Sequence, residues 1–378
     1  MVKRTPPMGW NTWNTFAENI NEDLLKKTAD FMVSSGFKDA GYEYVIIDDC
    51  WALKDRDENG KLVADPVKFP SGMKALGDYL HNLGLKFGIY SCVGTQTCQR
   101  YPGSFDYEFI DAKTFAEWGV DYLKYDFCYK PNSLSGEILY RRMSIALANC
   151  GRDILFNACS WGAEETHKWI NSTDVHAWRS TEDIFDNYKS IENLFLKQYN
   201  LLGYGGINSF NDMDMLVVGM KGKGNVGLGG MTKEEYITHF NIWAFMASNL
   251  IIGCDLLNTD KEYIDVLLNK DVIAINQDES VRQPFIIHDN TPTQKILGRH
   301  LSNGDLAFLL LNLGDTESCN FSFNLESIGL NRITGKTLLV KDLNSKKEFK
   351  ITNGVFDVSP YKLKPHCSLL FRAKVVDL

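Results

Sequence analysis

The sequence lacks any long hydrophobic run. None of its apolar stretches approaches the roughly 20 residues that a membrane-spanning helix requires. It also lacks a concentration of one charge, because 40 Lys and Arg residues are scattered among 48 Asp and Glu residues and the net charge is −8. We therefore expect no membrane partner, and no nucleic-acid partner either, since the latter would need a basic stripe. Sequence repeats and low-complexity segments are also missing, which argues against a solenoid or a disordered chain.

The N-terminal segment lacks the features of a secretory leader. Residues 1–7 run directly into the motif MGWNTWN, with neither an apolar leader core nor a small-residue cleavage site. We expect a cytoplasmic protein from the sequence as it stands, or a secreted one if a leader has been removed. The cysteines do not form the dense framework of small secreted domains, since nine of them are dispersed along a long chain. Most of them should be free and buried.

The length and composition indicate a folded protein with two domains. The chain has 378 residues, 44% of them hydrophobic and 23% charged. This length exceeds what one hydrophobic core usually contains, so a large domain and a smaller one are expected. The pattern of the sequence changes near residue 282, which predicts domains at 1–281 and 282–378. Homo-oligomerisation is possible but is not specified by the sequence.

The first of these domains alternates short apolar runs with longer amphipathic stretches, as in repeated βαβ units. Strands are predicted at 8–13, 42–48, 86–91, 122–126, 153–158, 175–178, 206–210 and 250–253. Helices are predicted at about 22–35, 71–83, 107–118, 136–149, 163–170, 188–201, 232–247 and 260–269. Eight strands are the number that closes a barrel, so we expect an α/β fold with a (β/α)₈ TIM barrel.

The second domain alternates apolar and polar residues and is interrupted by turn sequences, as in KILGRHLSNGDLAFLLLNLG. This pattern is typical of an antiparallel β-sandwich.

In the barrel, Thr232 followed by Glu235 predicts a capping box at the start of a helix.

Polar side chains follow several of the predicted barrel strands at the point where each strand ends. A single Asp there is more often a helix cap or a turn residue, but five such strand ends are harder to explain in that way. All strand ends of one direction meet at the same face of a barrel, which is where active sites form. These residues are Asp48, Asp49, Cys50, Trp51, Tyr90, Lys124, Tyr125, Asp126, Cys159, Ser160, Trp161, Arg179 and Asp183.

The segment YLKYDFC supplies a candidate nucleophile. Lys124 and Asp126 are two residues apart on a strand, so their side chains should lie on one face. A nearby cation favours the ionised carboxylate, although a structural ion pair would have the same pattern. Asp183 is the candidate partner carboxyl, and Arg179 is placed to bind sugar hydroxyls. A retaining glycosidase would hold the two carboxyls about 5–5.5 Å apart.

The sequence resembles glycoside hydrolase family 27, the α-galactosidases and α-N-acetylgalactosaminidases. The resemblance covers residues 6–216, and its motifs in order are PPMGWNTWN, IDDCW, FGIYS, LKYDFC, the CSWG segment, WRSTEDI and NDMDML. It implies a retaining exo-α-glycosidase that acts by double displacement on sugars of galactose configuration. The partner would be a carbohydrate with a terminal α-galactosyl or α-N-acetylgalactosaminyl residue.

The resemblance also implies individual roles. Asp126 would be the nucleophile and Asp183 the acid/base, and Cys98 would form a disulfide with Cys128, which is in doubt if the protein is cytoplasmic. Asp48 and Asp49 would accept hydrogen bonds from the axial 4-hydroxyl and the 6-hydroxyl and so select galactose. The subsite for the terminal sugar would consist of Trp13, Asp48, Asp49, Tyr90, Lys124, Ser160, Trp161, Ala163 and Arg179.

The residues after the fifth predicted strand indicate which group the sugar carries at its second carbon. Galactosidases of the family usually have Glu directly after the cysteine, whereas the N-acetylgalactosaminidases have Ser there and Ala three residues later. Ser160 and Ala163 therefore favour an α-N-acetylgalactosaminidase. A plain α-galactosidase is the alternative, in which both are merely small residues.

The sequence gives no reason to expect a cofactor or a metal. Gly222, Gly224 and Gly227 have the spacing of a dinucleotide motif but lack the acidic ribose partner in a βαβ context. The seven histidines show no ligand spacing. Two rival functions stay open, namely a sugar-binding relative without catalysis and a transglycosylase that uses the same residues.

Overall fold

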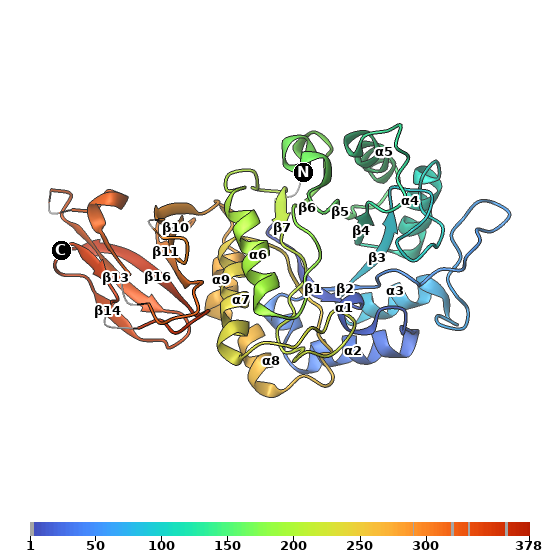
Figure 1. Ribbon diagram of the computed structural model, residues 1–378. Helices are drawn as coiled ribbons and strands as arrows, with labels where there is room; N and C mark the ends of the chain where they lie inside the picture. The colour runs from blue at the N-terminus through green and yellow to red at the C-terminus, as the bar shows by residue number, and fades with distance from the viewer. Residues whose placement is uncertain (1–3, 290, 319–320, 332, 360–361) are drawn as a thin grey trace.

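The computed structural model describes residues 4–289, 291–318, 321–331, 333–359 and 362–378. The chain forms two parts that lie side by side, as Figure 1 shows, with the N-terminal part built from alternating strands and helices and the C-terminal part built from strands. Both components of the predicted fold class, the barrel and the antiparallel sandwich, are confirmed.

The N-terminal part contains a parallel sheet of eight strands in the order β7-β6-β5-β4-β3-β2-β1-β8. The strands are β1 Met8–Asn11, β2 Tyr44–Ile46, β3 Lys86–Cys92, β4 Tyr122–Asp126, β5 Leu155–Cys159, β6 Ala177–Arg179, β7 Phe210–Asp212 and β8 Leu250–Ile252. Closure between the outer strands uses the segment after β7, where Leu216 forms a parallel bridge with Ile252. The Leu216 amide donates to the Ile251 carbonyl at 2.7 Å, and the Gly253 amide donates to the Leu216 carbonyl at 2.8 Å.

Helices connect these strands and surround the sheet in Figure 1. They are α1 Trp13–Phe16, α2 Glu22–Ser34, α3 Gly72–Asn82, α4 Glu108–Trp118, α5 Gly136–Ala148, α6 Tyr188–Tyr199, α7 Lys233–Phe245, α8 Lys261–Leu267 and α9 Lys270–Asn276. Side-chain caps fix several starts, and the capping box predicted at Thr232 and Glu235 is confirmed at α7. In the part of the chain that the structure describes, none of the helices has the length and apolar character needed to cross a bilayer.

Four predicted barrel elements differ from the structure. The strand expected at 8–13 ends at Asn11, and Trp13 begins α1. The seventh strand was expected at 206–210, but Gly206 and Ser209 exchange backbone hydrogen bonds in a turn and the strand is Phe210–Asp212. The expected helix at 163–170 is a short 3₁₀ segment, Ala163–Lys168, because Glu164 and Glu165 take left-handed backbone angles that an α-helix does not accept. The expected helix at 260–269 ends at Leu267, and α9 follows it.

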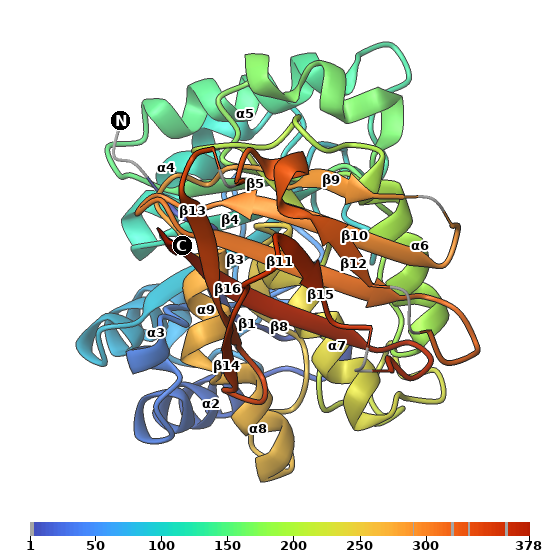
Figure 2. The same ribbon diagram turned by 90° about the vertical axis from the view of Figure 1, so that its left-hand side faces the viewer.

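The C-terminal part is a six-stranded antiparallel sheet, in the order β14-β13-β16-β11-β10-β9, with a second sheet of two strands. The strands of the larger sheet are β9 Phe285–His288, β10 Gln294–His300, β11 Leu306–Asn312, β13 Lys336–Asp342, β14 Glu348–Lys350 and β16 Ser368–Asp377. The smaller sheet pairs β12 Ser322–Asn324 with β15 Val355–Asp357. Seen from the side of this part, the large sheet lies in front of the barrel (Figure 2). Further 3₁₀ segments are Lys38–Ala40, Ile170–Ser172 and Leu325–Ile328.

Strand β11 joins the cores of the two parts. Its side chains alternate between the faces of the sheet, as the pleat requires. Leu309 and its neighbours of the same face belong to the hydrophobic cluster of the barrel, whereas Phe308 and Leu310 belong to the cluster between the two sheets. Burial on both faces explains why this strand is apolar at successive positions.

Most of the described cysteines are free, as expected, but only half of them are both free and buried. Cys50, Cys92, Cys159 and Cys254 are free and buried, and Cys150 and Cys367 are free and half-buried. Cys98 and Cys128 are joined in a disulfide. Cys319 lies outside the described residues.

We predict that Leu309→Ala lowers the free energy of unfolding by about 2–5 kcal/mol, because it removes a fully buried side chain and leaves a cavity between barrel and sandwich. Chemical denaturation followed by tryptophan fluorescence measures the change. Val375→Ala, at a 38% exposed position of the same sheet, is the control and should change the stability far less. Equal losses for the two variants would contradict a shared core.

Candidate active site

A cavity of about 280 Å³ opens where the barrel strands end. It lies at the carboxyl ends of the strands, the face on which barrel enzymes assemble their sites. Its walls are Trp13, Asn14, Asp48, Asp49, Tyr90, Cys98, Gln99, Lys124, Asp126, Trp161, Arg179, Asp183, Phe185, Asp214, Met215, Asn225 and Val226. The structure thus brings together both candidate catalytic carboxyls and most of the residues that the sequence singled out.

Asp126 is the last residue of β4, and it is almost fully buried. Its carboxylate accepts hydrogen bonds from the Tyr90 hydroxyl and from the Phe127 amide, both at 2.9 Å. Burial raises the pKa of Asp126 to about 6, although the charge of Lys124 and the hydrogen bonds act in the opposite direction. The negative charge of Asp183 adds to the rise. At neutral pH Asp126 is therefore ionised, poorly solvated and available as a nucleophile.

Lys124 lies on the same face of β4 as Asp126, as predicted, but its direct partner is Asp48. The Lys124 Nζ to Asp48 Oδ2 distance is 2.7 Å, and both side chains are largely buried. Burial acts to lower the pKa of Lys124, but the carboxylates of Asp48 and Asp126 outweigh it and hold the pKa well above its ordinary value. Lys124 therefore remains a cation and lowers the cost of keeping two carboxylates in the cavity.

Asp48 and Asp49 follow β2 and are each only 2% exposed. Asp48 also accepts from the Asn11 side-chain amide at 2.8 Å and from the Asp49 backbone amide at 3.0 Å. Asp49 accepts from the Thr97 hydroxyl at 2.9 Å and from the Gln99 amide at 3.0 Å. Burial raises the pKa of Asp49, and these hydrogen bonds act against the rise. The loop after β3 thus holds Asp49 in place.

Arg179, at the end of β6, connects the carboxyl of Asp183 to the barrel. Its guanidinium is buried and lies 3.0 Å from Asp183 Oδ1 and 3.1 Å from Asp214 Oδ1. The other oxygen of Asp214 accepts from the Ile184 amide at 2.8 Å. Burial acts to raise the pKa of Asp183, but the charges of Arg179 and Lys124 outweigh it and place the pKa below its ordinary value. Arg179 also donates to the Thr181 carbonyl at 3.0 Å, so Arg179 and Asp214 hold the peptide on either side of Asp183.

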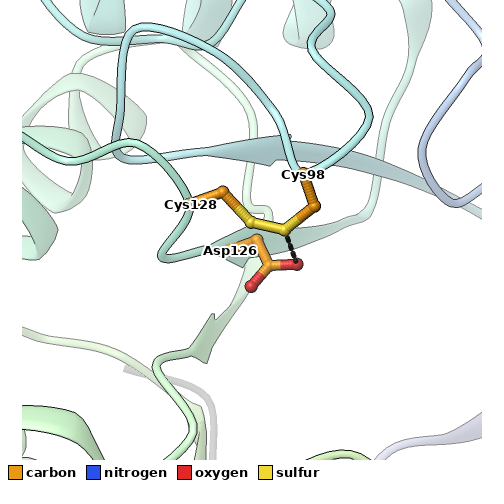
Figure 3. Close-up of side chains that lie close together, drawn as sticks. All are labelled: Cys98, Asp126 and Cys128. Carbon is orange, nitrogen blue, oxygen red and sulfur yellow. Dashed lines mark hydrogen bonds between the residues drawn. A yellow bond between two sulfur atoms is a disulfide. The ribbon is translucent and has the colours of Figure 1, made fainter.

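Figure 3 shows the Cys98–Cys128 disulfide next to Asp126. The Cys98 Sγ lies 3.6 Å from Asp126 Oδ2. A disulfide sulfur has no hydrogen to donate, so we interpret this approach as packing. The same three residues form a cluster with metal-binding spacing in the described part of the chain. A metal would need thiolates, which the disulfide removes. The absence of a metal requirement stays a prediction.

Two of the residues predicted for the sugar subsite do not line the cavity. Ser160 is fully buried, and its hydroxyl contacts the Thr166 hydroxyl at 2.8 Å and the Arg179 carbonyl at 3.2 Å. Asn157 and Cys159 of β5 line the interior of the barrel, whereas Ser160, directly after the strand, is turned away from the interior by these two contacts. Ala163 packs at the margin of the barrel core and is also missing from the cavity wall. These positions therefore give no support to the preference for N-acetylgalactosamine.

Sequence reasoning missed other cavity residues. These are Asn14, Gln99, Phe185, Asp214, Met215, Asn225 and Val226. Asp214 could have been found, because it stands in the NDMDML motif and follows a strand. Asn14 lies on the one-turn helix α1. The others lie on loops, whose folded positions no periodic pattern predicts.

Comparison with known proteins agrees with this geometry. Residues 5–278 match the family described as Alpha galactosidase A. Alpha-galactosidase 2 of Arabidopsis thaliana is 47% identical over 328 residues, which cover 86% of this chain and 80% of that protein. The structure of α-galactosidase I from Mortierella vinacea is 35% identical, with a TM-score of 0.86 and coverage of 98% of this chain and 96% of that one. An α-galactosidase of Saccharomyces cerevisiae, determined with raffinose, is 30% identical, with a TM-score of 0.83 and coverage of 98% of both chains. The family match, these relatives and the carboxyl-lined cavity at the ends of the strands show that the chain belongs to glycoside hydrolase family 27.

Proposed function

We propose that the protein is a retaining exo-α-galactosidase that releases terminal α-linked galactose from a carbohydrate. The observation that carries the proposal is the placement of Asp126 and Asp183 in one cavity whose buried end holds Asp48 and Asp49. The names of the relatives support galactose as the sugar. The expected preference for N-acetylgalactosamine rested on Ser160 and Ala163, neither of which lines the cavity, so the alternative of a plain α-galactosidase fits better.

The remaining hydrogen-bonding capacity of Asp48 and Asp49 supports a galactose-configured sugar. Asp48 accepts three hydrogen bonds, and so does Asp49. An ionised carboxylate offers about four acceptor positions, so each has about one left for a ligand. Two adjacent sugar hydroxyls fill these positions, namely the axial 4-hydroxyl and the 6-hydroxyl. A sugar with an equatorial 4-hydroxyl leaves one carboxylate unsatisfied, which costs about 1–3 kcal/mol.

In the first step Asp126 attacks the anomeric carbon while Asp183 protonates the departing oxygen. The transition state is oxocarbenium-like and leads to a covalent β-galactosyl enzyme. Water, deprotonated by Asp183, then releases galactose with its α configuration. Substrate binding removes water from Asp183, and this desolvation raises its pKa towards the range that a general acid needs. The loss of the charge on Asp126 in the intermediate lowers that pKa again, as the base step requires.

The proposal is tested by rates on three nitrophenyl α-glycosides. We expect kcat/KM for the α-galactoside to exceed that for the α-glucoside by roughly 10- to 200-fold, because one buried acceptor is left unpaired in the latter. The α-galactoside should also be preferred over the α-N-acetylgalactosaminide. Nitrophenyl β-galactoside serves as the control for anomeric selectivity. Equal rates on galactoside and N-acetylgalactosaminide would contradict the assignment of the sugar.

For Asp126→Asn we expect loss of turnover together with a more stable fold at neutral pH. The pKa of Asp126 is about 6 in the folded protein against 3.8 as its ordinary value, so the folded state binds more protons between these values. Its stability falls as the pH rises from about 4 to 6, and the full penalty is present above pH 6. The variant should therefore have a higher Tm than the parent at pH 7 and nearly the same Tm at pH 4.

Differential scanning calorimetry at the two pH values measures this effect. Asp39→Asn removes an exposed carboxyl and is the control, with no comparable gain at pH 7. Wild-type turnover in Asp126→Asn would exclude it as the nucleophile. A Tm difference independent of pH would exclude the pKa argument.

Asp183→Asn should reduce kcat/KM far more for a galactosyl disaccharide than for an activated dinitrophenyl galactoside. A sugar is a poor leaving group and needs the proton, whereas dinitrophenolate leaves without one. Steady-state kinetics on both substrates give the ratio. Glu182→Gln, which alters the exposed neighbouring carboxyl, is the control. Similar losses on both substrates would remove Asp183 from the acid role.

A further inference from the structure

Phe185 is an exposed aromatic side chain on the wall of the catalytic cavity. It is 47% exposed and lies two residues after Asp183. Its neighbours in sequence, Ile184 and Asp186, are fully buried. Single exposed apolar side chains are common, but Phe185 is one on the wall of a ligand cavity, where its ring is available to a bound ligand.

The backbone around Phe185 is held from both sides. The Ile184 amide donates to Asp214 at 2.8 Å. On the other side, Asp186 accepts from the Gly222 amide at 2.6 Å and from the Tyr236 hydroxyl at 2.8 Å. An aromatic ring on such a fixed segment contacts a ligand without first losing backbone freedom, so its apolar surface is available at low entropic cost.

The exposure of the cavity residues locates the second half of the substrate. Asp48 and Asp49 are 2% exposed and mark the deep end, whereas the Asp183 side chain is 64% exposed and marks the mouth. The terminal sugar occupies the deep end, and Asp183 must reach the oxygen that joins it to the leaving group. The leaving group therefore extends past Asp183 towards Phe185.

The rest of this wall favours a sugar over a lipid chain as the leaving group. The amide side chains of Gln99 and Asn225 line the same cavity and can pair with hydroxyls. A flat aromatic ring combined with amides suits a pyranose ring, which has an apolar C–H face and a polar rim, whereas a lipid chain needs a contiguous apolar patch.

We propose that Phe185 is the platform on which the sugar next to the scissile bond packs, so that it favours substrates whose leaving group is a pyranose ring. This inference rests on the proposed α-galactosidase function. It assigns Phe185 a role in selecting the leaving group, separate from the reading of galactose by Asp48 and Asp49.

The test compares a galactosyl-glucose disaccharide with α-galactosyl fluoride, whose leaving group has no ring to stack. Phe185→Ala should lower kcat/KM for the disaccharide about 3- to 10-fold more than for the fluoride, the range expected for one aromatic contact. Phe185→Tyr should restore the ratio of the two substrates, because it keeps the ring. Phe109→Ala, which removes a 59% exposed aromatic on α4, is the matched control and should leave the ratio at the wild-type value.

Inhibition by free galactose separates the two subsites, because it reports only the deep end of the cavity. We expect its inhibition constant to change much less in Phe185→Ala than kcat/KM for the disaccharide. Equal losses on disaccharide and fluoride would show that Phe185 has only a structural role and would overturn the inference. Wild-type rates on both substrates would overturn it as well. A wild-type protein inactive on α-galactosyl fluoride would instead overturn the proposed function itself.

Discussion

The site depends on five carboxylates and two cations gathered at the mouth of the barrel, where every one of the carboxylates except that of Asp183 is buried. The carboxylates are those of Asp48, Asp49, Asp126, Asp183 and Asp214, and the cations are Lys124 and Arg179. Burial of so much negative charge is unfavourable unless cations and hydrogen bonds compensate for it. Burial, with a smaller contribution from the charge of Asp183, raises the pKa of Asp126. The same excess of negative charge stabilises the positive charge that develops on a sugar ring during glycoside hydrolysis.

Backbone strain accompanies this arrangement. Cys50, Trp161 and Asp214 have positive φ angles, which side-chain-bearing residues adopt at a cost. Each follows a barrel strand and lies in or next to the cavity wall. The left-handed turn after Cys159 directs the Trp161 ring into the cavity while Ser160 stays buried behind it. The fold tolerates these turns because the barrel core and the shared core with β11 supply stability elsewhere.

Much of the fold could be predicted from the sequence, since periodicity is a local property. Strand β4 has the predicted bounds, and the capping box at Thr232 starts α7 as expected. The predictions of strand positions failed where contacts between distant segments outweighed the local preference of the residues for a strand. The segment at 206–210 has strand-like residues but forms a turn, and the barrel is closed by Leu216, beyond the end of β7.

The sequence by itself determined the order of most elements and the face of the barrel that carries the candidate site, because these follow from patterns only a few residues long. The roles of the two candidate catalytic carboxyls came from the resemblance of its motifs to a known family. Only the tertiary structure decided which strand-end side chains point into the cavity. Ser160 is excluded because it bonds to Thr166 and to the Arg179 carbonyl, and Asp214 and Phe185 enter because distant segments fix their backbone. Such contacts join residues that are far apart in the chain, and no local pattern encodes the direction in which a loop side chain finally points.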